Sequence, residues 1–211
     1  MKNYSGFLFD LDGTLVDTEK LKGAALAEAC RFFGGQVDAS TYKPVMGNSS
    51  QVVMAHFFET ADINPSTEKF NDTFEESYQR LLDKNLSPNL NAKDFLLRLR
   101  DKKKKMGVVS SETAPMAHQI LNQLDFAGFF DIVITEELVT RPKPDPEAYI
   151  LAMDKMDLPE SEVLVFEDSQ AGLMAAHKAG CDTVAFRHDF NINNDLSLAI
   201  RIISDFSEIE I

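Results

Sequence analysis

The sequence is poor in the features that mark disulfide-bonded and membrane-bound proteins. Only two of its 211 residues are cysteines, Cys30 and Cys181, a usage typical of a chain that is kept reduced in the cytosol. No run of about 18 apolar residues occurs that could span a bilayer. The first residues also do not combine a basic segment with an apolar one, as secretory leaders do. We therefore expect a cytoplasmic protein without a membrane partner.

Basic residues are in the minority. The chain has 21 Lys and Arg against 34 Asp and Glu, a formal net charge of -13. Nucleic acids and anionic membranes attract basic surfaces, so this balance argues against both as partners. The same negative field repels an anionic substrate, so any phosphate must be held by cations close to it. The dense cationic run at residues 102–105 is typical of a solvated helix end.

Histidine is scarce as well. The four histidines share no metal-ligand spacing and lie outside the motifs described below, so we assign them no catalytic role. They are His56, His118, His177 and His188. The composition is otherwise ordinary, with 44% hydrophobic and 26% charged residues. A chain of this length can form one or two domains with a well-buried core.

One short segment near the start organises the rest of the chain. An apolar run, residues 7–9, stops at Asp10, and Asp12 follows before a Gly-Thr pair that indicates a tight turn. This pattern predicts a buried strand with Asp10 at the carboxyl edge of a sheet. Two acids this close repel each other unless a cation or a shared proton intervenes, and their oxygen ligands suit Mg²⁺. Taken alone, the segment fits a turn-capping role for Asp10 equally well.

Two later apolar runs end in the same way. Residues 106–109 lead into Ser110, and residues 163–166 lead into Glu167 and Asp168. The carboxyl ends of parallel strands share one edge of a sheet, so these side chains are expected to join Asp10 and Asp12 there. Each could instead be a helix N-cap after a strand. Three such coincidences favour a shared, anion-rich site that needs a cation.

The chain changes character between its two ends. Residues 17–86 carry only helical patterns, at 18–33, 50–61 and 66–86, whereas strand and helix alternate beyond them. Alternation of this kind predicts a parallel α/β fold. We therefore expect an α/β core of residues 1–16 and 87–211 with a helical insertion of residues 17–86, although a single continuous fold without a hinge is the alternative.

The motifs, in this order, resemble those of the haloacid dehalogenase (HAD) superfamily, in its β-phosphoglucomutase-like subgroup. All four motifs of the superfamily are present, so the resemblance spans nearly the whole chain. The first is Asp10–Thr14, the second Ser110, the third Lys143 within residues 141–146, and the fourth Glu167-Asp168, which residues 169–172 extend. The resemblance implies a Rossmann-like parallel-sheet core with a helical cap of the C1 type, which would close over the site and exclude water.

The resemblance also implies catalytic roles. Asp10 would be the nucleophile that forms an aspartyl phosphate, and Asp12 the general acid and base. Thr14 would orient Asp12, and Ser110 would hydrogen-bond the phosphoryl group. Lys143 would keep Asp10 ionised, although on its own a lysine between prolines is more typical of an extended surface segment.

The implied cofactor is Mg²⁺. Asp10, the Asp12 backbone carbonyl and the Asp168 carboxylate would bind it, and Glu167 would do so directly or through water. Substrate-binding residues are expected at Thr14, at Ser111 beside the second motif, and in the cap. The cap candidates are Lys22, Lys43 and Gly47. For both lysines a solvated surface role is an equally good interpretation.

Lys22 stands where mutase relatives commonly carry His, and the Arg often found after Gly47 is missing. These departures favour hydrolysis over isomerisation. We therefore predict a monomeric, Mg²⁺-dependent phosphatase of small phosphate monoesters such as sugar phosphates. One alternative is a β-phosphoglucomutase-like phosphomutase. The other is a non-catalytic module phosphorylated on Asp10, which the helical insertion and Asp12 argue against.

Overall fold

The computed structural model describes residues 2–211, which form two compact units. The α/β unit contains residues 2–16, Pro88–His188 and Asn194–Ile211, and the helical unit contains Asp17–Ser87 and Asp189–Asn193. The expected division had placed Ser87 and residues 189–193 with the α/β core. The structure instead groups both with the helices, because the Ser87 carbonyl accepts from the Asp17 N–H and Phe190 packs against the helical core.

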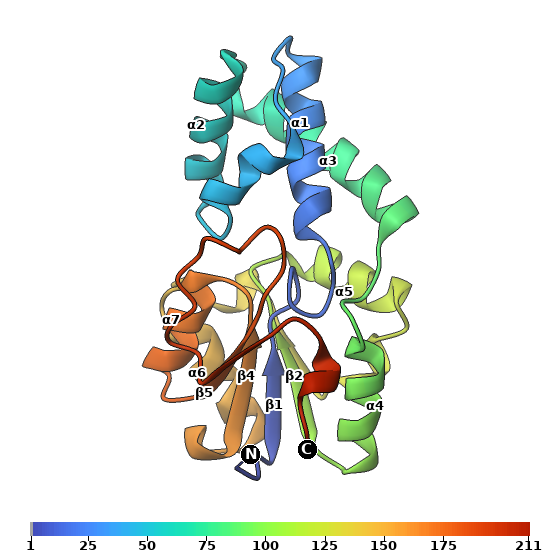
Figure 1. Cartoon of the computed structure of the whole chain (residues 1–211), viewed down its shortest axis with the longest axis vertical. Helices are drawn as coiled ribbons and strands as arrows, with labels where there is room; N and C mark the ends of the chain where they lie inside the picture. Colours follow the sequence, from blue (N-terminus) through green and yellow to red (C-terminus); the bar gives the residue numbers. More distant parts are fainter. Residues whose placement is uncertain (1) are drawn as a thin grey trace. The chain divides into compact units, whose positions relative to one another are not determined.

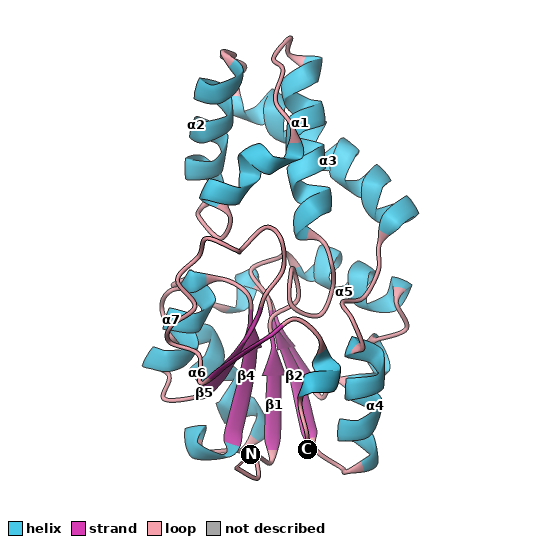
Figure 2. Cartoon of the chain, viewed as in Figure 1, coloured by secondary structure: helices cyan, strands magenta, loops and turns pink. Residues whose placement is uncertain are grey.

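A single six-stranded parallel sheet forms the centre of the α/β unit (Figures 1 and 2). Its strand order is β3-β2-β1-β4-β5-β6, and every neighbouring pair is parallel. The strands are β1 (Gly6–Phe9), β2 (Lys105–Val109), β3 (Ile132–Ile134), β4 (Val163–Glu167), β5 (Asp182–Phe186) and β6 (Arg201–Ile203). The predicted α/β class with a Rossmann-like parallel sheet is confirmed.

Parallel strands require crossover connections, which here are mostly helices. The α-helices of this unit are α4 (Ala92–Asp101), α5 (Ala114–Gln123), α6 (Glu147–Met156) and α7 (Gln170–Lys178). Short 3-10 helices lie at η2 (Ala127–Phe129), η3 (Glu136–Leu138), η4 (Glu160–Glu162) and η5 (Phe206–Glu208).

The central strand β1 is buried on both faces, as its continuous apolar sequence predicts. Leu8 points into the cluster that α6 and α7 form on one face of the sheet. On the other face, Phe9 stacks on Phe166 with ring centroids 5.0 Å apart and meets Phe95 of α4 edge to face. Packing on both faces fixes the register of β1 against β4, and therefore the position of the residues that follow each strand.

The helical unit consists of α1 (Glu19–Phe32), α2 (Ser50–Ala61), α3 (Thr67–Asn85) and the 3-10 helix η1 (Ala39–Val45). The bounds of α1, α2 and α3 match the expected helical segments within one residue, whereas η1 is not among them. The structure contains no strand within Asp17–Ser87 (Figure 2). Phe57 and Phe70 are fully buried at its centre. None of the helices among residues 2–211 is long and apolar enough to cross a bilayer.

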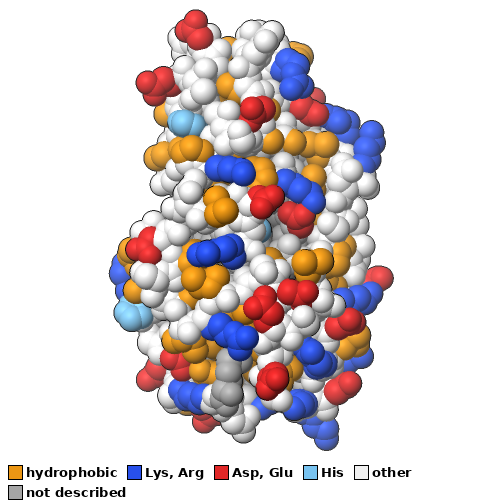
Figure 3. Space-filling view, in the orientation of Figure 1, with side chains coloured by type: hydrophobic (Ala, Val, Ile, Leu, Met, Phe, Trp, Pro, Cys, Tyr) orange, Lys and Arg blue, Asp and Glu red, His pale blue; other side chains and the backbone are white. Residues whose placement is uncertain are grey.

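Charged side chains of both signs lie interspersed on the face shown in Figure 3. On this face the excess of acidic residues therefore does not form one continuous negative surface. On this face, an approaching anion therefore meets local arrangements of charge rather than one broad negative field.

Candidate active site

The site is built where β1 and β4 end. The Asp10 backbone N–H donates to the Phe166 carbonyl at 2.9 Å, so the ladder between the two strands continues one residue past β1. This bond holds Asp10 beside Glu167 and Asp168. Asp10 is 8% exposed, Glu167 0% and Asp168 3%. One carboxylate oxygen from each of the three lies within 4.8 Å of the others, so the predicted meeting of these strand ends occurs.

Lys143 enters this cluster from the loop before α6. Its ammonium nitrogen Nζ donates to Asp10 Oδ1 at 2.7 Å, to Glu167 Oε1 at 2.7 Å and to the Val109 carbonyl at 2.9 Å. Three acceptors match the three N–H bonds of an ammonium group. The side chain is only 8% exposed, so Lys143 is part of the site and not a solvated surface lysine.

The charges of the cluster shift the pKa values of Lys143 and Asp10. Burial alone lowers the pKa of the Lys143 ammonium, but the carboxylates of Asp10 and Glu167 outweigh it and raise that pKa above its ordinary value. Burial raises the pKa of the Asp10 carboxyl well above its usual range; Lys143 opposes this, and the charges of Glu167 and Asp168 add to it. One cation against three carboxylates leaves a negative excess.

Glu167 accepts five hydrogen bonds. Its Oε1 accepts from Lys143 Nζ at 2.7 Å and from the Tyr149 hydroxyl at 2.8 Å. Its Oε2 accepts from the backbone N–H of Asp168 at 3.1 Å, and from the N–H and hydroxyl of Ser169 at 3.2 and 3.1 Å. A methyl group added to Gly172 would lie 1.8 Å from Oε1. Glu167 is therefore enclosed and hydrogen-bonded at both oxygens, one of which holds Lys143, and its part in metal binding remains a prediction.

Asp168 has a partner that the sequence did not indicate. Nε2 of His188 lies 2.9 Å from Asp168 Oδ2. An ionised carboxylate can only accept, so the imidazole is the donor in this pair. His188 follows β5, and its side chain is 15% exposed. No spacing in the sequence connects it to the motifs, because only the fold brings the end of β5 beside the end of β4.

The loop after Asp10 is tightly closed. Gly13 has a positive φ of 75°, and its N–H donates to the Val16 carbonyl at 2.8 Å. The Asn89 amide donates to the carbonyls of Gly13 and Thr14, both at 2.8 Å. These bonds fix the backbone on which Asp12 lies.

Thr14 departs from its predicted role. It is fully buried, and its hydroxyl Oγ1 has no hydrogen-bond partner among residues 2–211. The expected hydrogen bond that orients Asp12 is therefore not formed, and this buried hydroxyl is not accessible to a substrate in this structure. A buried polar atom left without a partner is unusual.

Ser110 follows β2 directly and is buried. Its N–H donates to the Ile134 carbonyl at 2.9 Å, and its hydroxyl accepts from the Glu112 N–H at 3.1 Å. The neighbouring Ser111 is exposed. The structure thus places both serines at the end of the strand next to β1.

The cap candidates belong to the helical unit. Nζ of Lys22 lies 3.5 Å from Glu19 Oε1 and 6.0 Å from the centroid of the Tyr78 ring. Nζ of Lys43 lies 5.3 Å from the Phe190 ring centroid. Gly47 is exposed and has a positive φ of 79°. Both lysines therefore contact neighbours in their own unit, and their substrate-binding role remains a prediction.

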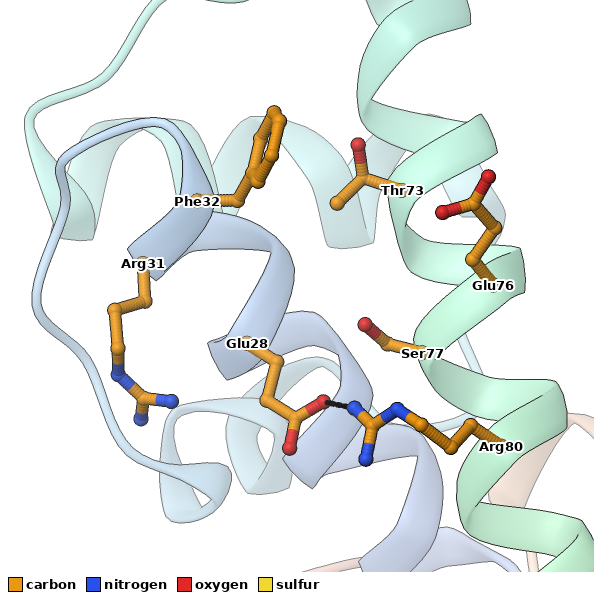
Figure 4. A pocket seen from close by; sticks show the side chains of 7 residues that line it. All are labelled: Glu28, Arg31, Phe32, Thr73, Glu76, Ser77 and Arg80. Carbon is orange, nitrogen blue, oxygen red and sulfur yellow. Dashed lines mark hydrogen bonds and ion pairs between the residues drawn. The ribbon is translucent and has the colours of Figure 1, made fainter.

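A separate surface pocket lies between α1 and α3 of the helical unit (Figure 4). It is lined by Glu28, Arg31, Phe32, Thr73, Glu76, Ser77 and Arg80. Glu28 and Arg80 form an ion pair across it, so these two opposite charges compensate each other within the pocket. It contains none of the predicted site residues.

Known proteins resemble this chain over most of its length. A phosphorylated carbohydrates phosphatase of Thermotoga maritima is 29% identical, over 84% of this chain and 82% of the relative. The validoxylamine A 7'-phosphate phosphatase of Streptomyces hygroscopicus subsp. limoneus is 30% identical, over 98% of this chain and 96% of the relative. The crystal structure of CbbY from Rhodobacter sphaeroides with phosphate has the same fold, with a TM-score of 0.84, 22% identity, and coverage of 97% and 96%.

The family model described as haloacid dehalogenase-like hydrolase matches residues 7–186. This range includes all four motifs and the residues that meet at the ends of β1 and β4. The resemblance found in the sequence is confirmed: the chain belongs to the haloacid dehalogenase-like hydrolase family.

Proposed function

We propose that this chain is a Mg²⁺-dependent phosphatase that hydrolyses small phosphate monoesters through an aspartyl phosphate on Asp10. The observation that carries the proposal is the pairing of Asp10 with Lys143 in a buried cluster that also contains Glu167 and Asp168. A nucleophilic carboxylate held beside a fixed cation is suited to phosphoryl transfer, because catalysis of this reaction depends mainly on positioning the reacting groups and on compensating their charge.

The donor set fits a divalent cation. Three carboxylates face one ammonium group, so a bound cation would remove the excess negative charge, and hard oxygen donors favour Mg²⁺. Asp10, Asp168 and the Asp12 backbone carbonyl are the groups that would hold it, whereas Glu167 is occupied by its five donors. When bound, Mg²⁺ would offset charge on the phosphoryl oxygens of the substrate.

The residues of the chain supply the remaining chemistry. A carboxylate oxygen of Asp10 attacks phosphorus, the ester P–O bond breaks, and Asp12 gives its proton to the departing alcohol oxygen. Lys143 remains positively charged and offsets the charge of the phosphoryl group. Asp12 then takes a proton from water as this water attacks phosphorus, which releases inorganic phosphate and restores Asp10. Ser110 hydrogen-bonds the phosphoryl group.

Sugar phosphates and related metabolites are the proposed substrates. Two relatives are named as phosphatases of phosphorylated carbohydrates and of validoxylamine A 7'-phosphate, and an Escherichia coli relative as a fructose-1-phosphate phosphatase. The helical unit acts as the cap, in which Lys22, Lys43 and Gly47 recognise the part of the substrate beyond the phosphate, together with Ser111. The chain acts as a monomer, which a single species of about 24 kDa in analytical ultracentrifugation would support.

A phosphomutase is the second candidate, because the fold is also that of a β-phosphoglucomutase from Clostridium difficile, with a TM-score of 0.79 and 20% identity. The two candidates differ in their products. We expect inorganic phosphate from several small monoesters with Mg²⁺, and no isomerised sugar phosphate. Glucose 6-phosphate formed from β-glucose 1-phosphate and a bisphosphate primer, faster than free phosphate, would establish the mutase instead.

A further inference from the structure

Tyr149 contacts the active-site cluster although it belongs to none of the four motifs. It lies in the first turn of α6 and is completely buried. Its neighbours in the core are mostly apolar residues of β1, β2, β4 and α6. A phenol hydroxyl in such a place must find a hydrogen-bond partner. Here it donates to Glu167 Oε1 at 2.8 Å, so its partner is a charged group of the site.

The same oxygen of Glu167 also accepts from Lys143 Nζ at 2.7 Å. Lys143 Nζ in turn lies 5.2 Å from the centroid of the Tyr149 ring, within the range of a cation–π contact. Tyr149 therefore contacts both members of the Glu167–Lys143 pair, one through its hydroxyl and the other through its ring.

We infer that Tyr149 is a positioning residue, which fixes the Glu167 carboxylate and, through it, the Lys143 ammonium beside Asp10. The inference rests on the proposed function, because it assigns Lys143 a task in phosphoryl transfer. The ammonium has three acceptors, and its geometry toward Asp10 depends on where the other two lie. The Val109 carbonyl belongs to the backbone of β2, so Glu167 is the acceptor whose position a side-chain substitution can change.

Removal of the Tyr149 hydroxyl would leave Oε1 with one donor in a fully buried place. A buried acceptor that loses one of its donors forms a stronger hydrogen bond with the donor that remains. The Lys143 ammonium would then shift toward Glu167 and away from Asp10. Burial and the charge of Glu167 raise the pKa of Tyr149 well above its ordinary value, which agrees with a hydroxyl that keeps its proton and donates a hydrogen bond to Glu167.

The chain offers a matched control. Tyr4 is also buried, and its hydroxyl donates to a carboxylate oxygen, Asp182 Oδ2, at the same distance of 2.8 Å. Asp182 opens β5 and belongs to none of the motifs. Tyr149→Phe and Tyr4→Phe thus each remove a phenol hydroxyl that donates to a carboxylate, and only the first variant touches the Glu167–Lys143 pair.

The first measurement is steady-state hydrolysis of p-nitrophenyl phosphate with Mg²⁺. For Tyr149→Phe we expect kcat to fall about 10-fold or more, as for loss of a hydrogen bond to a charged group, with KM within about twofold of wild type because ground-state binding is unchanged. Tyr4→Phe should keep both constants. If folded Tyr149→Phe retains the kcat of the wild type, the inference is wrong.

The second measurement needs no turnover. In protein labelled with ¹⁵N-lysine, the buried Lys143 ammonium should give a slowly exchanging resonance, assigned by its absence in Lys143→Met. This resonance should shift in Tyr149→Phe and stay unchanged in Tyr4→Phe. An unchanged Lys143 resonance in Tyr149→Phe would overturn the inference. A shifted resonance in a protein that releases no phosphate would support the positioning role and contradict the proposed function.

Discussion

The Lys143 ammonium nitrogen lies 2.7 Å from Asp10 Oδ1, although 133 positions separate the two residues in the chain. The parallel sheet delivers Asp10, and the loop before α6 delivers Lys143. The lysine also bonds Glu167, so one buried cation links the end of β1 to the end of β4. The effects expected of several substitutions on activity and stability follow from this link.

Replacing Lys143 by Met should abolish most activity and destabilise the fold. Loss of the cation leaves the Asp10 and Glu167 carboxylates buried without compensation, which for a buried pair costs about 3–5 kcal/mol. We therefore expect a lower urea midpoint, part of which Mg²⁺ restores because a bound cation replaces some of the lost charge. Lys93→Met, at an exposed position of α4, is the control. Equal midpoints for the two variants would contradict the structural role of Lys143.

The two acids at the end of β4 should respond differently to substitution. Asp168→Asn should weaken Mg²⁺ binding more than Glu167→Gln, because Glu167 is enclosed by five donors whereas Asp168 is the expected ligand. Glu167→Gln should mainly lower kcat, since it loosens Lys143. Titration calorimetry measures the Mg²⁺ affinity of both variants. A larger loss of affinity in Glu167→Gln than in Asp168→Asn would make Glu167, and not Asp168, the main metal ligand.

His188→Ala should weaken Mg²⁺ binding through Asp168. The imidazole donates to Asp168 Oδ2 at 2.9 Å and so orients the carboxylate. Removal of a hydrogen-bond partner of this kind typically lowers metal affinity about 10- to 100-fold. His118→Ala, on α5, serves as the control. Identical Mg²⁺ affinities in calorimetry for the two variants would rule out an orienting role for His188.

Glu147 should make the fold sensitive to acid. The Thr140 backbone N–H lowers the pKa of Glu147 to about 2, with help from the Arg141 side chain and backbone. Since the folded-state pKa is below the unfolded one, this stabilisation is present above the ordinary pKa and is lost as the pH falls toward about 2. Glu147→Gln should therefore lose less stability than wild type between about pH 5 and 2 in acid unfolding. If the free energy of unfolding of the two proteins falls in parallel with pH, Glu147 makes no such contribution to stability.

The sequence predicts the three central strands of the sheet, β2, β1 and β4, because they are buried on both faces and therefore appear as continuous apolar runs. The acids that follow β1 and β4 then meet by the geometry of parallel strands alone. Lys143 differs: its flanking prolines indicate only an extended segment, and family resemblance was needed to place it in the site.

Other site residues could not be found in the sequence. Tyr149 matches the apolar pattern of α6 and is indistinguishable from a core residue until the position of Glu167 is known. His188 follows a strand without any motif. Outside the site, Phe190 likewise packs against the helical core through tertiary contacts that no sequence pattern indicates. The closed surroundings of Glu167 depend on the first turn of α7, so only the structure shows how its carboxylate is enclosed.

The most direct test of the account is phosphate release by Asp10→Asn, measured with Mg²⁺ on a panel of phosphorylated sugars. The variant keeps the size of the side chain and removes the nucleophilic charge, so we expect a folded protein with no detectable turnover and no trapped acyl phosphate. Asp154→Asn, on α6 and outside the motifs, should match wild type. Near-normal phosphate release by pure, folded Asp10→Asn would contradict the central claim that Asp10 carries the phosphoryl group.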